Sequence, residues 1–275
     1  MIDFSVSFLE FFSATFIPLY LAMVTVAYLQ MKFRISVRYL SSFALGLMFW
    51  FVFDTLNDAV QLDVNNGYDF AASATHIGLV VVFVFGFLVV ALSSTYFISR
   101  GNGDNTGNTL PLFIAVVIVA IGMGFHGIAE GIEFGGLSAG TQAATVLDAI
   151  GGIGGGIAYV LHKFLEASMV AIVYLGISIA KSESFRHKLT KMAVFGLAFG
   201  LPSALGEIVG YFVQVDSVYF FALGAGAALS VSLLIAFSIF QHSQNRGLAY
   251  SQWMWTMLAA SVGFLCLYGA AMFHS

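Results

Sequence analysis

Two segments of the chain pair a histidine with a glutamate four residues later. The first pair is His126 and Glu130, and the second is His162 and Glu166. On an α-helix, residues four apart share a face, so each segment would present one imidazole and one carboxylate together. Two such helices facing each other would form a cluster of two histidines and two glutamates. That ligand set suits Zn²⁺ and similar transition metals.

Each pair taken alone also fits a purely structural role. A histidine inside an apolar helix can be a hydrogen-bonded packing residue, and a glutamate can be protonated and bonded to a neighbouring helix. We favour a binding site because two consecutive apolar segments carry the same His-x-x-x-Glu spacing.

The composition indicates a membrane protein. Of the 275 residues, 60% are hydrophobic and 9% are charged, whereas soluble domains carry roughly 25% charged residues. The mean hydropathy is +0.94. A single cysteine, Cys266, excludes a disulfide scaffold. A net charge of -4 without a basic patch argues against a nucleic-acid partner. The 29 glycines fit closely packed membrane helices.

A membrane-spanning helix needs about 20 mostly apolar residues. The sequence predicts an all-α polytopic protein with one transmembrane domain over residues 1–275. Its fifth span is longer than a bilayer requires, and the glycines from Gly151 to Gly156 predict an irregular, kinked or closely packed beginning. The eight predicted spans are 8–31, 39–60, 74–98, 110–134, 145–180, 192–213, 217–240 and 250–273.

The basic residues predict the orientation. Nine of the ten lysines and arginines fall in loops on one side: Lys32, Arg34, Arg38, Arg100, Lys181, Arg186, Lys188, Lys191 and Arg246. By the positive-inside rule this side is cytoplasmic and both termini are extracytoplasmic. The tenth basic residue, Lys163, lies inside span five. With Asp3 and Glu10 and no basic region, the N-terminus is not expected to be a cleaved signal.

Other polar residues lie toward the outer ends of the spans. Asp54, Asp58, Glu133 and Asp148 could form an access route for cations, or could be ordinary polar helix ends. Met48 lies at mid-depth in span two, where methionine is usually a filler of apolar space.

Together these motifs resemble the ZIP family of divalent metal transporters. The family's span-four pattern, His-Asn-x-x-Asp/Glu-Gly, is matched by His126-Gly127-Ile128-Ala129-Glu130-Gly131. In span five, His162-Lys163-Phe164-Leu165-Glu166 follows the family's His/Glu spacing but lacks its proline. Span two, from Phe43 to Met48, and span six, from Phe199 to Tyr211, also resemble the family's patterns, and the resemblance is weak outside these four spans.

The resemblance implies a set of metal ligands and an activity. It would place one metal on Met48, His126, Glu130, His162 and Glu166. It implies import of a divalent metal, with Zn²⁺ as the default and Cd²⁺, Fe²⁺, Mn²⁺ or Co²⁺ as other possible ions. It also implies a homodimer, in which spans one, four, five and six move as a block against the rest.

The family's second metal site is not conserved here. Its ligand positions hold Gly127, Lys163 and Ser203. Two neighbouring carboxylates repel each other, and the Lys163 ammonium could replace the second metal by keeping Glu130 and Glu166 ionised. In the competing interpretation, Lys163 turns away and pairs with Glu207 or Glu133.

We therefore expect a metal transporter rather than an enzyme, in a plasma membrane or a prokaryotic inner membrane. An intramembrane zinc-dependent hydrolase would use the same ligands with an open position for water. A metal receptor without transport is a further alternative. A retinal-type pigment would use Lys163 as a Schiff base, but adjacent metal-type ligands count against it.

Overall fold

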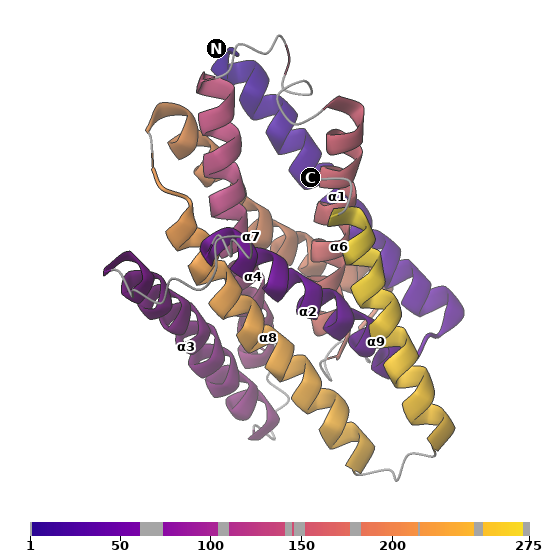
Figure 1. The fold of residues 1–275 in the computed structure, drawn as a ribbon. Coiled ribbons are helices and arrows are strands. Elements are labelled where there is room, and N and C mark those ends of the chain that lie inside the picture. The colour runs from indigo at the N-terminus through magenta and orange to yellow at the C-terminus, as the bar shows by residue number, and fades with distance from the viewer. Residues whose placement is uncertain are drawn as a thin grey trace.

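The chain folds into a bundle of long helices (Figure 1). The computed structural model describes residues 2–60, 74–103, 110–140, 145, 152–176, 183–213, 215–244 and 250–271. In this part of the chain there are eight helices and no strand: α1 (Phe4–Phe33), α2 (Val37–Val60), α3 (Ala74–Gly103), α4 (Leu110–Gly140), α6 (Gly152–Gly176), α7 (Phe185–Phe212), α8 (Val218–Gln244) and α9 (Tyr250–Ala271). Each is long and apolar enough to cross a membrane. The predicted all-α polytopic fold is confirmed.

Most helices end at other residues than the spans predicted from hydropathy. Most helices extend beyond the apolar stretch, as in α4, which ends at Gly140 rather than at 134, because a helix continues past its apolar part until a residue breaks it. Of the predicted fifth span, 145–180, the structure describes residue 145 and a helix over 152–176, and the other residues lie outside the described part of the chain. Its helix α6 begins at Gly152, which has a positive φ of 75°. The residues from Gly154 to Gly156 are regular helix, whereas Gly151 lies outside the described residues.

Local sequence signals fix several of these ends. Asp3 caps α1 by accepting a hydrogen bond from the backbone N–H of Ser5 at 2.9 Å, and Arg34 ends it in the left-handed conformation. Ser184 caps α7 in the same way through the N–H of His187, at 3.4 Å. Both caps set where the chain enters its span.

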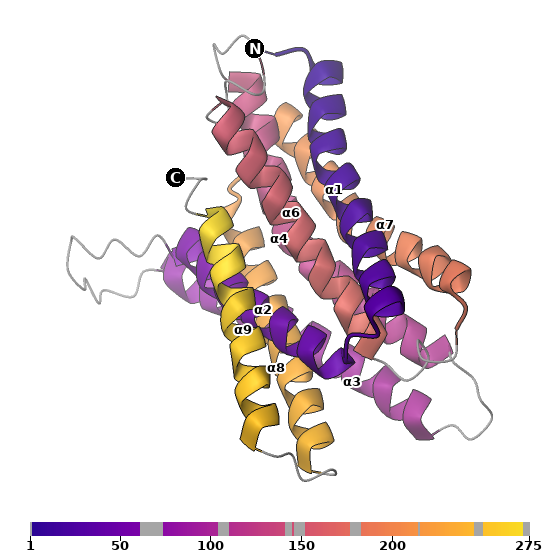
Figure 2. The same ribbon diagram turned by 90° about the vertical axis from the view of Figure 1, so that its right-hand side faces the viewer.

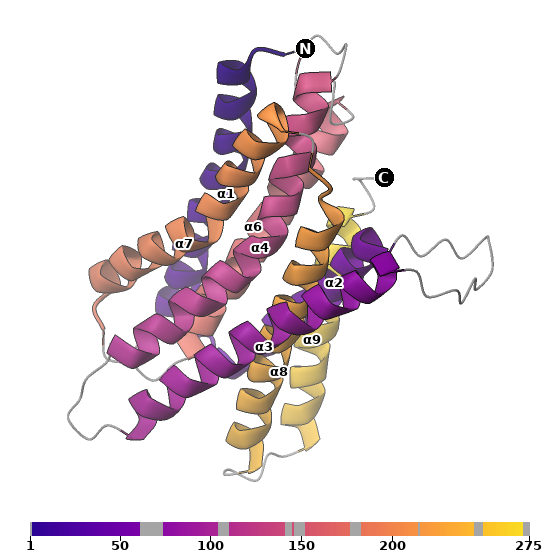
Figure 3. The same ribbon diagram turned by 90° about the vertical axis from the view of Figure 1, so that its left-hand side faces the viewer.

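The helices form two groups of four. One contains α1, α4, α6 and α7, and the other contains α2, α3, α8 and α9 (Figures 2 and 3). Glycines let helices within a group touch through their backbones. A Cβ added to Gly131 of α4 would lie 2.6 Å from the backbone nitrogen of Glu207 on α7, and one on Gly46 of α2 would lie 2.7 Å from the carbonyl carbon of Ala260 on α9. Such contacts make each group a closely packed unit.

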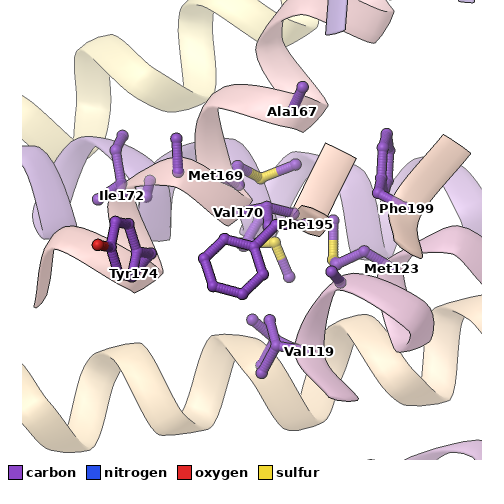
Figure 4. Packing of buried hydrophobic residues seen from close by; sticks show 14 of the residues in the cluster. Val119, Met123, Ala167, Met169, Val170, Ile172, Tyr174, Phe195 and Phe199 are labelled. Atoms are coloured by element: carbon purple, nitrogen blue, oxygen red, sulfur yellow. The ribbon is translucent and has the colours of Figure 1, made fainter. Parts of the chain in front are cut away.

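Buried apolar side chains fill the spaces between α4, α6 and α7. Figure 4 shows Phe195 and Phe199 of α7 gathered with Val119 and Met123 of α4 and Val170 of α6. By contrast, α3 carries a row of exposed large apolar side chains, among them Val80, Val81 and Phe85. This distribution fits a bundle whose outer surface is covered by lipid.

Candidate metal centre

The two predicted His/Glu pairs meet in the interior of the bundle. His126 and Glu130 come from α4, and His162 and Glu166 come from α6. One ligand atom from each side chain lies within 4.8 Å of the other three. Both histidines and Glu166 are buried, and the Glu130 side chain is 15% exposed. The structure therefore confirms the predicted juxtaposition and gives a buried group that could hold a metal ion.

The four distances between histidine nitrogens and carboxylate oxygens are close to those around one tetrahedral ion. Nε2 of His126 lies 3.3 Å from Oε1 of Glu130 and 3.7 Å from Oε1 of Glu166. Nε2 of His162 lies 3.9 Å and 3.1 Å from the same two oxygens. In a tetrahedral Zn²⁺ site with bonds of about 2.0–2.1 Å, neighbouring ligand atoms are about 3.3 Å apart. The four histidine-to-carboxylate distances therefore lie on both sides of the tetrahedral value.

Helix α2 orients the first imidazole. Thr55 Oγ1 donates a hydrogen bond to the carbonyl oxygen of Phe51 at 2.8 Å and lies 3.4 Å from Nδ1 of His126. Since the hydroxyl proton is donated to Phe51, the threonine oxygen can accept a hydrogen bond from the N–H of a His126 tautomer protonated at Nδ1. That tautomer leaves the lone pair of Nε2 directed at the other ligands, an arrangement common in metal sites.

Aromatic and glycine residues of the second helix group enclose the site. The Phe51 ring packs edge-on against His126, with centroids 4.7 Å apart, and Phe221 of α8 lies 5.3 Å away. A Cβ on Gly224 of α8 would lie 2.7 Å from the backbone nitrogen of His126. The ligands on α4 and α6 are thus packed directly against α2 and α8, where the two groups meet.

Lys163 contacts both glutamates. Its Nζ donates to Oε2 of Glu166 at 2.6 Å and to Oε2 of Glu130. The Oε1 atom of each carboxylate is the one that lies near the histidines. Lys163 is fully buried and lies over the rings of Tyr159 and Phe199. The structure therefore shows the predicted contact with the two ligand carboxylates, and not the competing pairing with Glu207 or Glu133.

The other residues of the predicted second site lie on the contact between α4 and α7. A Cβ on Gly127 would overlap Oγ of Ser203 in its present rotamer, so the two residues are packed directly against each other. Ser203 Oγ is buried and has no hydrogen-bond partner in the described part of the chain. Glu207 is buried one turn further along α7, where its Oε1 accepts a hydrogen bond from Ser7 of α1 at 2.9 Å.

The predicted methionine ligand and the predicted access residues differ in how far they are buried. Met48 is fully buried on α2, three residues before Phe51. Asp54 is half-buried on the same helix. Glu133 is exposed and accepts a hydrogen bond from Ser217 at 2.9 Å. The side chain of Asp58 and the whole of Asp148 lie outside the described residues.

Sequence reasoning did not identify Thr55, Phe51 or Tyr159. The Tyr159 hydroxyl shares a hydrogen bond with Thr15 of α1 at 3.0 Å and its ring lies beneath the Lys163 ammonium. The sequence does contain a pattern that indicates Phe51 and Thr55. Together with Met48 they are spaced three and four residues apart, which places all three on one face of α2. That face is the one that meets His126.

Comparison with known proteins gives no match to a family model and none to a curated protein. The fold and the geometry of the His/Glu cluster therefore carry the functional inference.

Proposed function

We propose that this protein carries a divalent transition metal across the membrane into the cytoplasm, through a single site made by His126, Glu130, His162 and Glu166. The observation that carries this proposal is the position of the cluster. Four convergent metal-type ligands, three of them buried, lie inside the bundle at the contact between its two helix groups. Ionisable groups at such depth are costly and are typical of ion pathways.

The position favours transport over a purely structural ion. All four ligands belong to the group of α1, α4, α6 and α7, while Phe51, Thr55 and Phe221 of the other group contact His126. A displacement of one group relative to the other would carry the ligands with it and change which side of the membrane they reach. Alternating access in many transporters uses such a rigid-body movement around a fixed site.

Lys163 supports a stoichiometry of one ion. With neutral histidines, one ammonium and two carboxylates give the cluster a net charge of -1, which a divalent ion converts to +1. Because the ammonium uses the Oε2 atoms and the histidines lie near the Oε1 atoms, Lys163 and a metal ion can be bound together. A second ion would have to displace the lysine.

The ligand types favour Zn²⁺ as the substrate. Imidazole and carboxylate ligands in a tetrahedral arrangement are typical of zinc, and Cd²⁺, Fe²⁺, Mn²⁺ and Co²⁺ are further candidates that the same ligands accept. The resemblance of spans two, four, five and six to ZIP transporters agrees with this substrate class.

Metal flux into proteoliposomes tests the proposal. The purified protein would be reconstituted, and uptake of Zn²⁺, Cd²⁺, Mn²⁺ and Fe²⁺ would be measured separately. The ligand variant is Glu130→Gln with Glu166→Gln, and the control is Glu10→Gln, which removes an exposed carboxylate from α1. We expect saturable uptake in the wild type and the control but not in the ligand variant.

Two other results would contradict transport. If the wild type binds one metal per chain and shows no flux, while the ligand variant binds none, the site is structural, sensory or catalytic. If the wild type neither binds nor moves metal, the cluster is a hydrogen-bonded network that holds α4 and α6 together.

A further inference from the structure

A pocket of about 250 Å³ lies between the end of α1 and the beginning of α7, away from the metal centre. Its lining residues are Gln30, Met31, Arg34, Glu183, Phe185 and Lys188. These positions are the ends of two spans, so the pocket lies at the edge of the membrane. It is on the side that the positive-inside rule predicts to be cytoplasmic.

The pocket has two cationic side chains without an anionic partner. In the described part of the chain, no carboxylate lies within ion-pair distance of Arg34 or Lys188. Among the described residues, the Lys188 ammonium has one hydrogen bond, to the neutral side-chain oxygen of Gln30 at 3.4 Å. The one acidic lining residue, Glu183, is already paired with Lys191 and accepts a hydrogen bond from Tyr174.

Apolar surface adjoins these cations. Met31 is 47% exposed and Phe33, directly before Arg34, is 61% exposed. Both belong to the last turn of α1, where exposed apolar side chains face lipid. Phe185, the first residue of α7, lines the pocket itself and brings the N-terminus of that helix toward it. Helix N-termini favour anions through their free N–H groups.

We propose that this pocket binds the phosphate of an anionic phospholipid from the cytoplasmic leaflet. The Arg34 guanidinium and the Lys188 ammonium would hold the phosphate oxygens, and the acyl chains would lie along the apolar end of α1. Basic pockets between transmembrane helices on this side of the membrane are suited to such headgroups. The bound lipid would join α1 to α7 within one helix group, independently of metal binding.

Lipid titration of the purified protein in detergent tests this inference. The probes are short-chain phosphatidylglycerol, short-chain phosphatidylcholine and inorganic phosphate, and binding is measured by native mass spectrometry and by the melting temperature. The test variant is Arg34→Gln with Lys188→Gln. Its matched control is Lys32→Gln with Arg186→Gln, which removes the same charge from the same side without changing a pocket residue.

We expect phosphatidylglycerol to bind the wild type and the control, and to raise their melting temperatures. The loss of two interfacial cations should weaken its binding to the test variant by about 30-fold. Equal weakening in both variants would contradict a defined pocket and indicate general surface electrostatics. Binding of inorganic phosphate as tightly as phosphatidylglycerol, or equal binding of phosphatidylcholine, would also overturn the proposal.

Discussion

Lys163 and Glu166 lie three residues apart on α6, and the ammonium is 2.6 Å from Oε2 of the carboxylate. The other oxygen of Glu166, Oε1, lies 3.1 Å from Nε2 of His162. The same carboxylate thus uses one oxygen for a permanent cation and presents the other among the histidines. Lys163 is therefore part of the charge balance of the His/Glu cluster.

Replacing Lys163 with methionine should destabilise the metal-free protein. The change leaves Glu130 and Glu166 close together in the interior without their cation, and breaking a buried pair in this way costs about 3–5 kcal/mol. We expect the melting temperature of Lys163→Met to fall by roughly 10 °C, and added Zn²⁺ to restore part of the loss.

The double variant Lys163→Met with Glu166→Gln is the control for this prediction. It removes one charge of each sign and should recover part of the stability lost in the single variant. An unchanged melting temperature in Lys163→Met would contradict the charge-balancing role of the lysine.

Replacing Thr55 with valine should weaken metal binding without removing a ligand. Valine keeps the shape of threonine but cannot accept a hydrogen bond from Nδ1 of His126. Loss of such an orienting partner typically costs 10-fold or somewhat more in affinity. We expect Zn²⁺ affinity, measured by isothermal titration calorimetry, to fall by about tenfold in Thr55→Val. Thr55→Ser retains the hydroxyl and should bind nearly as well as the wild type, and equal losses in the two variants would exclude this role.

Much of the fold and the four central residues could be predicted because both depend on local patterns. Apolar runs of sufficient length specify spans, and the four-residue spacing places His126 with Glu130 and His162 with Glu166 on a helix face. Hydropathy alone does not show where the glycine-rich segment before Tyr159 becomes helical, and the structure describes this helix from Gly152.

The partners of the site residues depend on packing between distant segments. Thr55 meets His126 across 71 residues, and Ser7 meets Glu207 across 200. Before the helices are packed, Lys163 could equally have reached Glu207 or the ligand carboxylates. The packing of α6 against α4 and α7 decides which carboxylates Lys163 contacts. The spacing of residues in the sequence does not predict this packing.

Glu183 should make stability depend on pH at the N-terminal end of α7. Partial burial opposes its ionisation, but hydrogen bonds from Lys191 and Tyr174 and the charge of Lys191 outweigh this and hold the pKa of Glu183 below its usual value. A carboxyl with a lowered native pKa stabilises the fold above its unfolded pKa of about 4.3, and this contribution is lost as the pH falls through the native pKa.

The measurement compares the melting temperatures of the wild type and Glu183→Gln from about pH 7 down to about pH 3. The variant should be less stable at neutral pH, and the difference should disappear at the acidic end. Glu10→Gln, which changes an exposed carboxylate of α1, controls for the loss of a negative charge. A difference that stays constant over the whole range would show that the Glu183 carboxylate contributes nothing through its ionisation.

Replacing Gly131 with alanine should separate α4 from α7. A Cβ at this position would lie 2.6 Å from the backbone nitrogen of Glu207 and 3.0 Å from the carbonyl carbon of Gly206, and backbone atoms of a packed helix cannot move aside individually. Overpacking of this kind costs about 1–3 kcal/mol, which exceeds the gain of about 1 kcal/mol from the higher helix propensity of alanine. We expect a lower melting temperature and, because Gly131 adjoins Glu130, weaker Zn²⁺ binding.

Gly136 provides the matched control on the same helix. A Cβ there meets only the carbonyl oxygen of Gly210, at an ordinary contact distance of 3.7 Å. Gly136→Ala should therefore gain helix propensity without overlap, and its melting temperature should equal or exceed that of the wild type. If both alanine variants behave alike, the close backbone contact between α4 and α7 does not hold the metal ligands in place. If only Gly131→Ala loses stability and Zn²⁺ affinity together, the glycine contact positions Glu130 within the site.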